Sequence, residues 1–395
     1  MMPFVNLTGQ RNAYRDELEA AERAVLDSGC YIGGPEVKAL EGELAAFCGD
    51  SPRGKVSAVT CGSGTEALTL ALLALGVAPG DEVIVPDFTF IACAECVSML
   101  GARPVFADID PETLQILPGS AESLVGPKTR GIIAVDLFGQ CAPYTELRRI
   151  ADEHGLWIIE DAAQAFGATT GGQRACTFGD IAITSFYPSK PLGCYGDGGA
   201  VFTPNVQLAE KVRMLANHGS RERYLHETVG VNSRLDALQA AVLRVKLRHL
   251  EDELKVRREN ARKYDEFFGS LNGGLNGNLN GAKIVPQKIA EGNTSTYAQY
   301  TVLAENRKAF IDKLDAAGIP HCIHYPMALH CQPCFAGASD TAGLNAASLN
   351  GTGLNTADLN GAANNATRAS ETVVSLPVCA FTDVDFILNK LRSVL

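Results

Sequence analysis

Lys190 is the residue of this chain whose surroundings best suit nucleophilic chemistry. It lies in residues 184–200 (TSFYPSKPLGCYGDGGA), a stretch rich in small residues between the apolar runs 181–183 and 200–202. Both runs read as buried strands, so Lys190 is predicted to lie in the loop that joins them. An amine in such a loop can attack a carbonyl and form a Schiff base with a cofactor. The alternative is an ordinary solvated surface lysine.

A carboxylate and an amide follow the end of another predicted strand. Residues 157–159 are apolar, and Asp161 and Gln164 come soon after them among alanines. A carboxylate buried at a strand end needs a partner, and a bound cation such as a protonated pyridine nitrogen would provide one. The alternative is that Asp161 caps the N-terminus of a helix.

A third feature of the chain could bind an anion. Residues 56–60 read as a strand, the small residues 61–65 read as a turn that contains Gly64 and Thr65, and a helix begins directly afterwards. Backbone N–H groups at a helix N-terminus bind phosphate groups. Many turns of α/β proteins have this composition, so the pattern alone is only a weak indication.

Bringing these groups together requires a sheet whose strand ends meet. Short apolar strands at 83–85, 105–107, 132–135 and 157–159 alternate with helical segments near 90–100, 119–125 and 143–154. This alternation predicts a mostly parallel sheet covered on both faces, with ligands beyond the carboxyl ends of its strands. Apolar spacing predicts further helices at 12–28, at 36–48, at 206–217 and from about 237 to 268.

The layout of the chain predicts two domains, a large one over residues 1–255 and a smaller C-terminal one over residues 256–395. The C-terminal part contains Leu-Asn pairs near 271–281 and near 339–365, surrounded by Asn and Gly. The second tract repeats every five residues, which matches neither a helix nor a strand. Both tracts are therefore predicted to be mobile low-complexity surface loops that take no part in the chemistry.

The composition limits the kind of partner this protein has. A hydrophobic content of 46% and a net charge of −11 are typical of a soluble globular protein and disfavour a nucleic-acid or anionic-membrane surface. No export signal or membrane-length apolar segment is visible, so the twelve cysteines are expected to be free thiols in a reducing cytoplasm. The C-x-x-C pair at Cys93 lies in what reads as a packed helix, and the pair at Cys331 lacks a matching pair nearby. The histidines of residues 321–330 share no helical face, so no metal is expected.

Taken in order, the motifs resemble those of the DegT/StrS sugar aminotransferases, which use pyridoxal 5′-phosphate (PLP). The matching segments are 31–36 (YIGGPE), 63–68 (SGTEAL), 160–164 (EDAAQ), the Lys190 loop, 232–236 (NSRLD) and 324–326 (HYP). The resemblance covers nearly the whole chain apart from the Leu-Asn tracts. It implies the α/β fold of PLP fold type I, as in aspartate aminotransferase, with a mostly parallel sheet in the large domain and a smaller C-terminal α/β domain.

The resemblance also implies roles around the cofactor ring. Lys190 would hold PLP covalently and, once released by substrate, move the proton during catalysis. Asp161 would pair with the pyridine nitrogen, and Gln164 would lie near the ring oxygen. Phe88 would stack on the pyridine face, and its alternative is packing in the core.

Other positions would bind the phosphate group. Gly64, Thr65 and Ser185 would hold it within one subunit. Asn232 would reach it from the other subunit, which implies an obligate homodimer with shared active sites.

The implied reaction is a transamination in two halves, in which L-glutamate gives its amino group to the cofactor and a keto group of a nucleotide-linked sugar takes it. Residues 188–199 (PSKPLGCYGDGG) are similar to those of bacterial 3-aminotransferases that act on a UDP-linked 2-acetamido-3-keto-hexuronic acid. Those enzymes serve the synthesis of diacetamido uronic acids of surface polysaccharides such as lipopolysaccharide O-antigen. Two alternatives stay open: a 4-keto nucleotide-sugar aminotransferase and a non-catalytic PLP-binding regulatory protein.

The carboxylate of such a sugar needs a cationic partner. Arg234 has the forked geometry for that role, and the alternative is a structural pair with Asp236 or a neighbouring acid. His324 and Tyr325 are expected to contact the sugar or its nucleotide.

Overall fold

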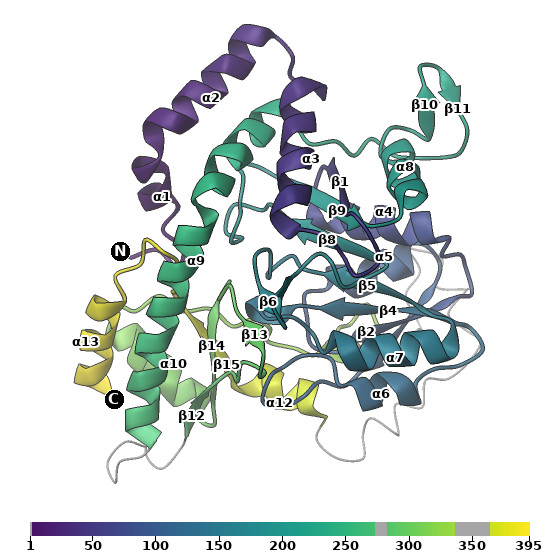
Figure 1. The fold of residues 1–395 in the computed structure, drawn as a ribbon. Coiled ribbons are helices and arrows are strands. Elements are labelled where there is room, and N and C mark those ends of the chain that lie inside the picture. Colours follow the sequence, from purple (N-terminus) through teal and green to yellow (C-terminus); the bar gives the residue numbers. More distant parts are fainter. Residues whose placement is uncertain (1, 273–282, 336–363) are drawn as a thin grey trace.

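A seven-stranded sheet forms the centre of the molecule in the computed structural model, which describes residues 2–272, 283–335 and 364–395 (Figure 1). Its strands, in the order β1-β9-β8-β5-β4-β2-β3, are β1 (Ser57–Cys61), β9 (Gly199–Thr203), β8 (Ile181–Ser185), β5 (Trp157–Asp161), β4 (Thr129–Val135), β2 (Glu82–Pro86) and β3 (Arg103–Ala107). Only β9 runs against the others. The predicted mostly parallel sheet is confirmed.

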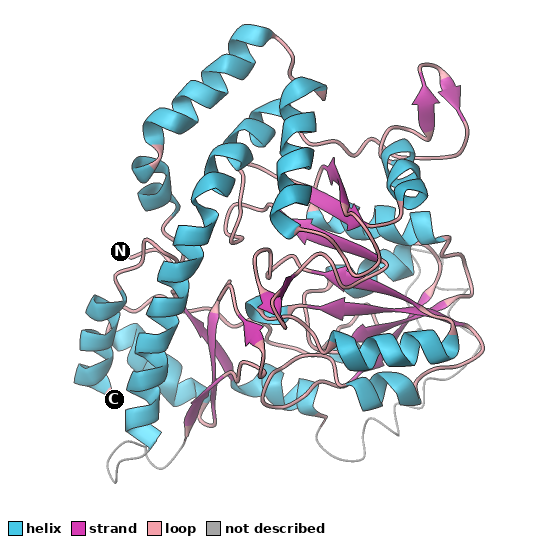
Figure 2. Cartoon of the chain, viewed as in Figure 1, coloured by secondary structure: helices cyan, strands magenta, loops and turns pink. Residues whose placement is uncertain are grey.

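Helices cover both faces of this sheet, as Figure 2 shows. One face packs against α3 (Gly34–Cys48), α6 (Pro118–Ser123), α7 (Tyr144–His154) and the first part of α9 (Ala237–Asn272). The opposite face packs against α4 (Gly64–Leu75), α5 (Ala92–Met99) and α8 (Val206–Leu215). The strands are buried on both sides, which explains why they read as continuous apolar runs rather than alternating ones.

The N-terminal helix predicted at 12–28 is broken in the structure. It forms α1 (Leu7–Ala13) and α2 (Arg15–Ser28), which meet at Tyr14. The ring of Tyr14 stacks on His249 of α9 with 4.0 Å between ring centroids. We attribute the break to this tertiary contact, because the local sequence contains no Gly or Pro at that point.

A second core lies in the C-terminal part. The antiparallel sheet β12-β14-β15 consists of β12 (Ile284–Pro286), β14 (Tyr300–Ala304) and β15 (Val373–Leu376). It packs with α10 (Arg307–Ala316), α13 (Val384–Val394) and the second part of α9, while α12 (Asn365–Thr372) extends toward the large sheet. The boundary at residue 255 stays a prediction, because α9 runs through both cores.

Smaller elements complete the fold. They are β6 (Thr169–Thr170), β7 (Gln173–Arg174) and β13 (Asn293–Thr294) in one small sheet, the hairpin β10 (Ser220–Glu222) and β11 (Leu225–His226), and the short 3₁₀ turns Leu137–Gly139 and Leu329–Cys331. No helix in the described ranges is long and apolar enough to cross a membrane. All twelve cysteines are free thiols. The predicted Leu-Asn loops fall largely on residues 273–282 and 336–363, outside the described residues.

Candidate active site

The carboxyl ends of β5 and β8 lie side by side at the centre of the sheet. Asp161 is the last residue of β5 and pairs in register with Ile183 of β8. Two residues later β8 ends at Ser185, and the loop to β9 carries Lys190. A hydrogen bond of 2.8 Å from the Cys194 N–H to the Phe186 carbonyl closes this loop. The sequence prediction that strand ends bring these groups together is confirmed.

The electrostatics of Lys190 differ from those of a surface lysine. Its side chain is half-buried, and burial lowers the pKa of its amine, an effect opposed by the negative charge of Asp161. Burial likewise raises the pKa of Asp161, whereas the hydrogen bond from the Ala163 N–H lowers it. A lowered pKa increases the fraction of free amine, which is the nucleophilic form. The arrangement therefore suits attack on a carbonyl.

Both oxygens of Asp161 accept hydrogen bonds. Oδ1 accepts from the Ala163 N–H at 3.0 Å, and Oδ2 accepts from the Cys93 thiol at 3.2 Å. The residues that follow form a turn, so the alternative that Asp161 caps a helix is wrong. The side chain is only 6% exposed, and no ion pair reaches it in the described part of the chain. A carboxylate so buried is suited to a cationic ligand.

Cys93 is a site residue that the sequence analysis did not assign. It lies on α5, is buried, and donates its thiol hydrogen to Asp161. Burial and the charge of Asp161 raise the pKa of Cys93, so it stays protonated and keeps its donor. Its neighbour Cys96 donates instead to the Thr65 carbonyl. The C-x-x-C pattern thus joins α5 to two separate parts of the site.

The predicted phosphate-binding residues Gly64 and Ser185 are brought together, with Thr65 beside them; we call these three residues the anion cradle. The N-terminus of α4 begins at Gly64, and the Ser63 side chain caps it by accepting from the Glu66 N–H at 3.1 Å. A Cβ on Gly64 would lie 2.6 Å from the Ser185 Cβ. Glycine is therefore required where the helix N-terminus approaches the end of β8, and this N-terminus can hold an anion.

Three further residues lie near Asp161 and Lys190, namely Gln164, Tyr325 and His324. Gln164 Oε1 accepts from the Phe138 N–H at 2.7 Å, and its Nε2 donates to the Tyr325 hydroxyl at 3.1 Å. His324 Nδ1 lies 3.0 Å from the Ser375 hydroxyl. Burial, aided by the nearby charge of Lys190, lowers the pKa of His324 to about 4, so its imidazole is neutral at pH 7.

Two phenylalanines near Tyr325 differ in exposure. Phe88 is 1% exposed, and its ring centroid lies 6.2 Å from that of Tyr325 and 6.5 Å from that of Phe138. Phe90 is 51% exposed, and its ring centroid lies 6.1 Å from that of Tyr325. Phe88 thus has the core packing that was its alternative reading, and its stacking on a ligand stays a prediction. Phe90 was missed, although it follows in the same Phe-Thr-Phe motif.

Asn232 and Arg234 lie at the surface beside the N-terminus of α4. Both are exposed, while Ser233 between them is buried and donates to Glu66 at 2.5 Å. This bond fixes residues 232–234 beside the N-terminus of α4. No ion pair joins Arg234 to Asp236 or to any other residue that the structure describes. The structural pairing considered for Arg234 is absent there.

Comparisons with known proteins agree with this arrangement. Residues 12–380 match the DegT/DnrJ/EryC1/StrS aminotransferase family. A Pseudomonas aeruginosa protein, UDP-2-acetamido-2-deoxy-3-oxo-D-glucuronate aminotransferase, is 46% identical over 336 residues, which cover 85% of this chain and 89% of the relative.

Two solved structures are similar over nearly the whole chain. Streptomyces venezuelae DesV, in complex with a ketimine intermediate, has a TM-score of 0.86 at 38% identity and covers 99% of this chain and 97% of its own. NtdA from Bacillus subtilis, with bound cofactor PMP, has a TM-score of 0.83 at 27% identity and covers 100% of this chain and 85% of its own.

The residues present fit PLP. The half-buried amine of Lys190 suits its aldehyde, the buried carboxylate of Asp161 suits its ring nitrogen, and the anion cradle suits its phosphate. When bound, PLP supplies an electron sink for the carbanion formed on an amino acid. The chain belongs to the DegT/DnrJ/EryC1/StrS aminotransferase family and is a PLP-dependent aminotransferase.

Proposed function

We propose that this protein transfers an amino group from L-glutamate to the 3-keto group of a UDP-linked 2-acetamido-hexuronic acid, in the cytoplasm, for surface polysaccharide synthesis. The observation that carries the proposal is the 46% identity to a relative named for a 3-oxo uronate substrate. The composition of the loop around Lys190 supports the same sugar position.

The site residues would divide the work as follows. Lys190 would move the proton at the substrate Cα, because its amine lies in the loop beyond β8 and its lowered pKa makes it a competent base. Asp161 would keep the ring nitrogen of PLP protonated, and the anion cradle would fix its phosphate. Gln164 and Tyr325 would limit the position of the ring, since their hydrogen bond joins the large sheet to the C-terminal part.

We also propose that the protein acts as a homodimer with shared active sites. The hairpin β10–β11 projects from the body of the molecule, as Figure 1 shows. Tyr224 at its tip is 81% exposed and Val229 below it is 91% exposed, and both lie close in sequence to Asn232. A second copy would cover these apolar side chains and receive Asn232 near its own phosphate.

Arg234 would bind the carboxylate of the uronic acid. Its guanidinium is exposed and free of ion pairs in the described ranges, while the buried Ser233 fixes the backbone beside it. A guanidinium that no internal carboxylate neutralises can form a bidentate pair with a carboxylate ligand. His324 and Tyr325 would contact the sugar or its nucleotide from the C-terminal part.

Mass spectrometry of products tests the proposal. The protein with PLP and L-glutamate is offered a UDP-3-keto-hexuronate generated in situ, beside a 4-keto nucleotide sugar, with Lys190→Ala as the control. We expect an aminated product from the 3-keto substrate alone and none with the control. Product from the 4-keto sugar alone would overturn the substrate. Neither product, with no effect of glutamate on the visible absorbance of bound PLP, would favour a non-catalytic regulatory protein.

A further inference from the structure

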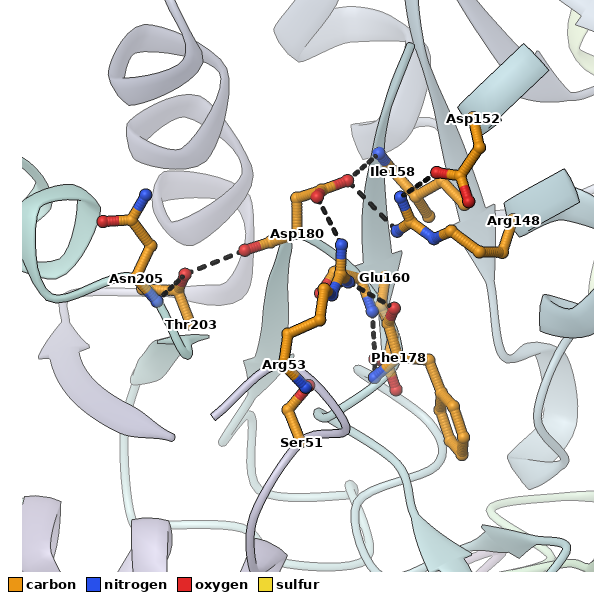
Figure 3. Close-up of polar contacts among 11 residues, drawn as sticks. Ser51, Arg53, Arg148, Asp152, Ile158, Glu160, Phe178, Asp180, Thr203 and Asn205 are labelled. Carbon is orange, nitrogen blue, oxygen red and sulfur yellow. Dashed lines mark hydrogen bonds and ion pairs between the residues drawn. The ribbon is translucent and has the colours of Figure 1, made fainter. Parts of the chain in front are cut away.

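Behind the site, Glu160 occupies a pocket made of backbone N–H groups. It directly precedes Asp161, so its side chain points to the opposite face of the sheet, where it is fully buried. Oε1 accepts from the Cys176 N–H at 2.5 Å, and Oε2 accepts from the N–H groups of Phe178 at 2.8 Å and Gly179 at 3.1 Å. Figure 3 shows Glu160 beside Phe178. Three donors and no acceptor favour an ionised carboxylate.

The loop that supplies these donors is itself held in place. Asp180, which follows it, accepts hydrogen bonds from Arg53 at 2.5 Å, from Arg148 at 3.1 Å and from the Ile158 N–H at 2.7 Å (Figure 3). Arg53 also donates to the carbonyls of residues 178 and 179. The N–H groups around Glu160 therefore have little freedom to turn away.

Asp136, at the end of the neighbouring strand β4, is also fully buried. Its Oδ1 accepts from the Ala142 N–H and from the Tyr144 hydroxyl, both at 2.8 Å. Its Oδ2 is buried, and no hydrogen-bond donor of the described residues reaches it. Ala134 of β4 pairs in register with Glu160, which places Asp136, two residues further along, beside Glu160, and the two carboxyl groups interact. An acceptor without a donor, against a second carboxyl group, indicates a proton that lies between the two.

Among the described residues, the other titratable groups that act on the two carboxyl groups include no cation. Tyr144 on α7, Cys141 in the loop after β4 and Cys176 in the loop before β8 lie on the same face of the sheet, and Asp161 acts from the opposite face. All are acids, and burial raises the pKa of each of them. Two buried carboxylates without a cation cannot both carry a charge.

We propose that Asp136 is a carboxylic acid at neutral pH that donates a hydrogen bond from Oδ2 to the ionised Glu160, and that this pair positions Asp161 and Gln164. Glu160 holds the charge because three N–H groups face it. The directions of the pKa shifts agree with this order: burial raises the pKa of both carboxyl groups, and that of Asp136 well above its ordinary range, while the three backbone N–H groups oppose the rise at Glu160. The pair shares one proton across the sheet.

The link from the pair to the site passes through the backbone. The Asp136 N–H donates to the Asp161 carbonyl at 2.9 Å. Asp136 also begins the turn in which the Phe138 N–H holds Gln164. Asp136 and Glu160 are therefore positioning residues, and this part of the inference rests on the proposed roles of Asp161 and Gln164.

Two isosteric variants test the protonation state. In Asp136→Asn, the amide oxygen accepts both hydrogen bonds and the NH₂ group donates to Glu160 without the uptake of a proton, so we expect a melting temperature at pH 7 equal to or higher than that of wild type. In Glu160→Gln, the NH₂ group faces backbone N–H groups, so we expect a melting temperature several degrees lower. Equal losses in both variants, or a larger loss in Asp136→Asn, would overturn the assignment.

Infrared spectroscopy and pH provide readouts that do not depend on catalysis. The difference spectrum of wild type minus Asp136→Asn, recorded on the PLP-loaded protein at pH 7, should contain the C=O stretch of one protonated carboxylic acid. Its absence would overturn the proposal. As pH rises from about 5 to 7, the native wild type keeps a proton that the unfolded chain has lost. Asp136→Asn should therefore gain stability relative to wild type, up to about tenfold in the unfolding constant per pH unit.

Positioning is tested by rescue. Asp136→Ala should shift the pH dependence of the visible absorbance of bound PLP and lower kcat more than it raises KM, and Asp136→Asn should restore both. Equal defects in the two variants would overturn the positioning role. Lys190→Ala separates this inference from the proposed function: it should abolish turnover yet keep the carboxylic acid band.

Discussion

At the scale of single residues, the site depends on a balance between burial and charge. Burial alone would neutralise both Lys190 and Asp161, because it disfavours the charged form of each. Each charge opposes that effect at the other. A protonated ring nitrogen bound beside Asp161 would replace Lys190 as the positive charge that stabilises the Asp161 carboxylate. Lys190 could then lose its proton and become the free amine.

Lys190→Ala should remove the base of the reaction. We expect kcat to fall by about 10²-fold or more, because a positioned proton-transfer group contributes about 10² to 10⁴ in rate. Mass spectrometry after borohydride treatment should find PLP attached to wild type and not to the variant. Attachment in Lys190→Ala would identify a different lysine as the nucleophile.

Phe88 and Phe90 should respond differently to truncation. Phe88→Ala removes a ring from the core and should cost about 3 to 5 kcal/mol of unfolding free energy. Phe90→Ala removes a half-exposed ring and should change stability little while weakening PLP binding, because Phe90 has a free face beside Tyr325. Thermal melts and PLP titrations of both variants measure the contrast. A binding defect in Phe88→Ala at native stability would instead support stacking by Phe88.

The neutral His324 makes stability depend on acid pH. Its pKa is lowered to about 4 in the folded state against about 6.5 in the unfolded chain, so its contribution is complete above pH 6.5. Stability should fall by up to about 1.4 kcal/mol per pH unit from this group as pH drops from 6.5 to 4. Denaturant titrations at several pH values in this range give the unfolding free energy of wild type and of His324→Gln. A plot of that free energy against pH should be steeper for wild type, and equal slopes would show that His324 does not titrate there.

At the scale of elements, the site is a meeting of helix and strand ends. The N-terminus of α4 meets the end of β8 at Gly64, and α9 contacts the Lys190 loop through Lys246. Lys246 of α9 is buried, donates to the Gly193 carbonyl at 2.7 Å and lies 4.4 Å from the ring centroid of Tyr195. Burial lowers the pKa of Lys246 to about 8.

Gly64→Ala should weaken PLP binding without unfolding the protein. The added Cβ would meet Ser185 at 2.6 Å and push α4 away from β8, which separates the anion cradle. Gly42→Ala is the matched control, because nothing lies within 4 Å of its added Cβ in α3. We expect the control to bind PLP as wild type does and to be slightly stabilised by helix propensity. Equal PLP affinity in both variants would contradict the close approach.

Lys246→Met should destabilise the loop that carries Lys190. It leaves the buried Gly193 carbonyl without its donor, at a cost of about 1 to 3 kcal/mol. Lys255→Met on the same helix removes only an exposed pair with Asp252, so it should change stability by less than about 0.5 kcal/mol. Hydrogen exchange of residues 186–196 should rise only in Lys246→Met, and an unchanged rate would mean that other bonds suffice.

Elements were easier to predict from the sequence than contacts. The strands of the central sheet are apolar runs closed by turn residues, so their existence and the meeting of Asp161 with the Lys190 loop follow from local pattern. The turn after Asp161 and the break at Tyr14 depend on tertiary contacts that no local pattern encodes. The thiol of Cys93 joins Asp161 across 68 residues of chain, and only the folded sheet brings them together.

At the scale of the whole molecule, the proposed homodimer concerns the surface that carries the hairpin β10–β11. The exposed hairpin β10–β11 and the exposed Asn232 are features of a surface that another subunit would cover. The pattern of apolar residues predicted neither feature. A residue that acts in a partner's site is exposed in its own subunit, so it does not take part in the apolar spacing from which elements are predicted. Only the resemblance to a family predicted the role of Asn232.

Mixing two inactive variants tests the shared site. Lys190→Ala and Asn232→Ala should each be inactive or nearly so, but a mixed dimer contains one site with neither change. Co-refolded or co-expressed variants should recover up to about a quarter of wild-type activity, by random pairing of subunits. Sedimentation should show dimers throughout. No recovery in a sample that is dimeric would place both residues in the same subunit's site.

The helix α9 has a mechanical consequence for the molecule. It is 36 residues long and packs into both cores, with its first part under the large sheet and its last part against Tyr300 and Phe310. At about 1.5 Å per residue it is a rod of roughly 54 Å. If the C-terminal core unfolded, the last part of α9 would lose its packing contacts, and the first part of the helix would be destabilised with it. The two halves should therefore unfold together in a single calorimetric transition.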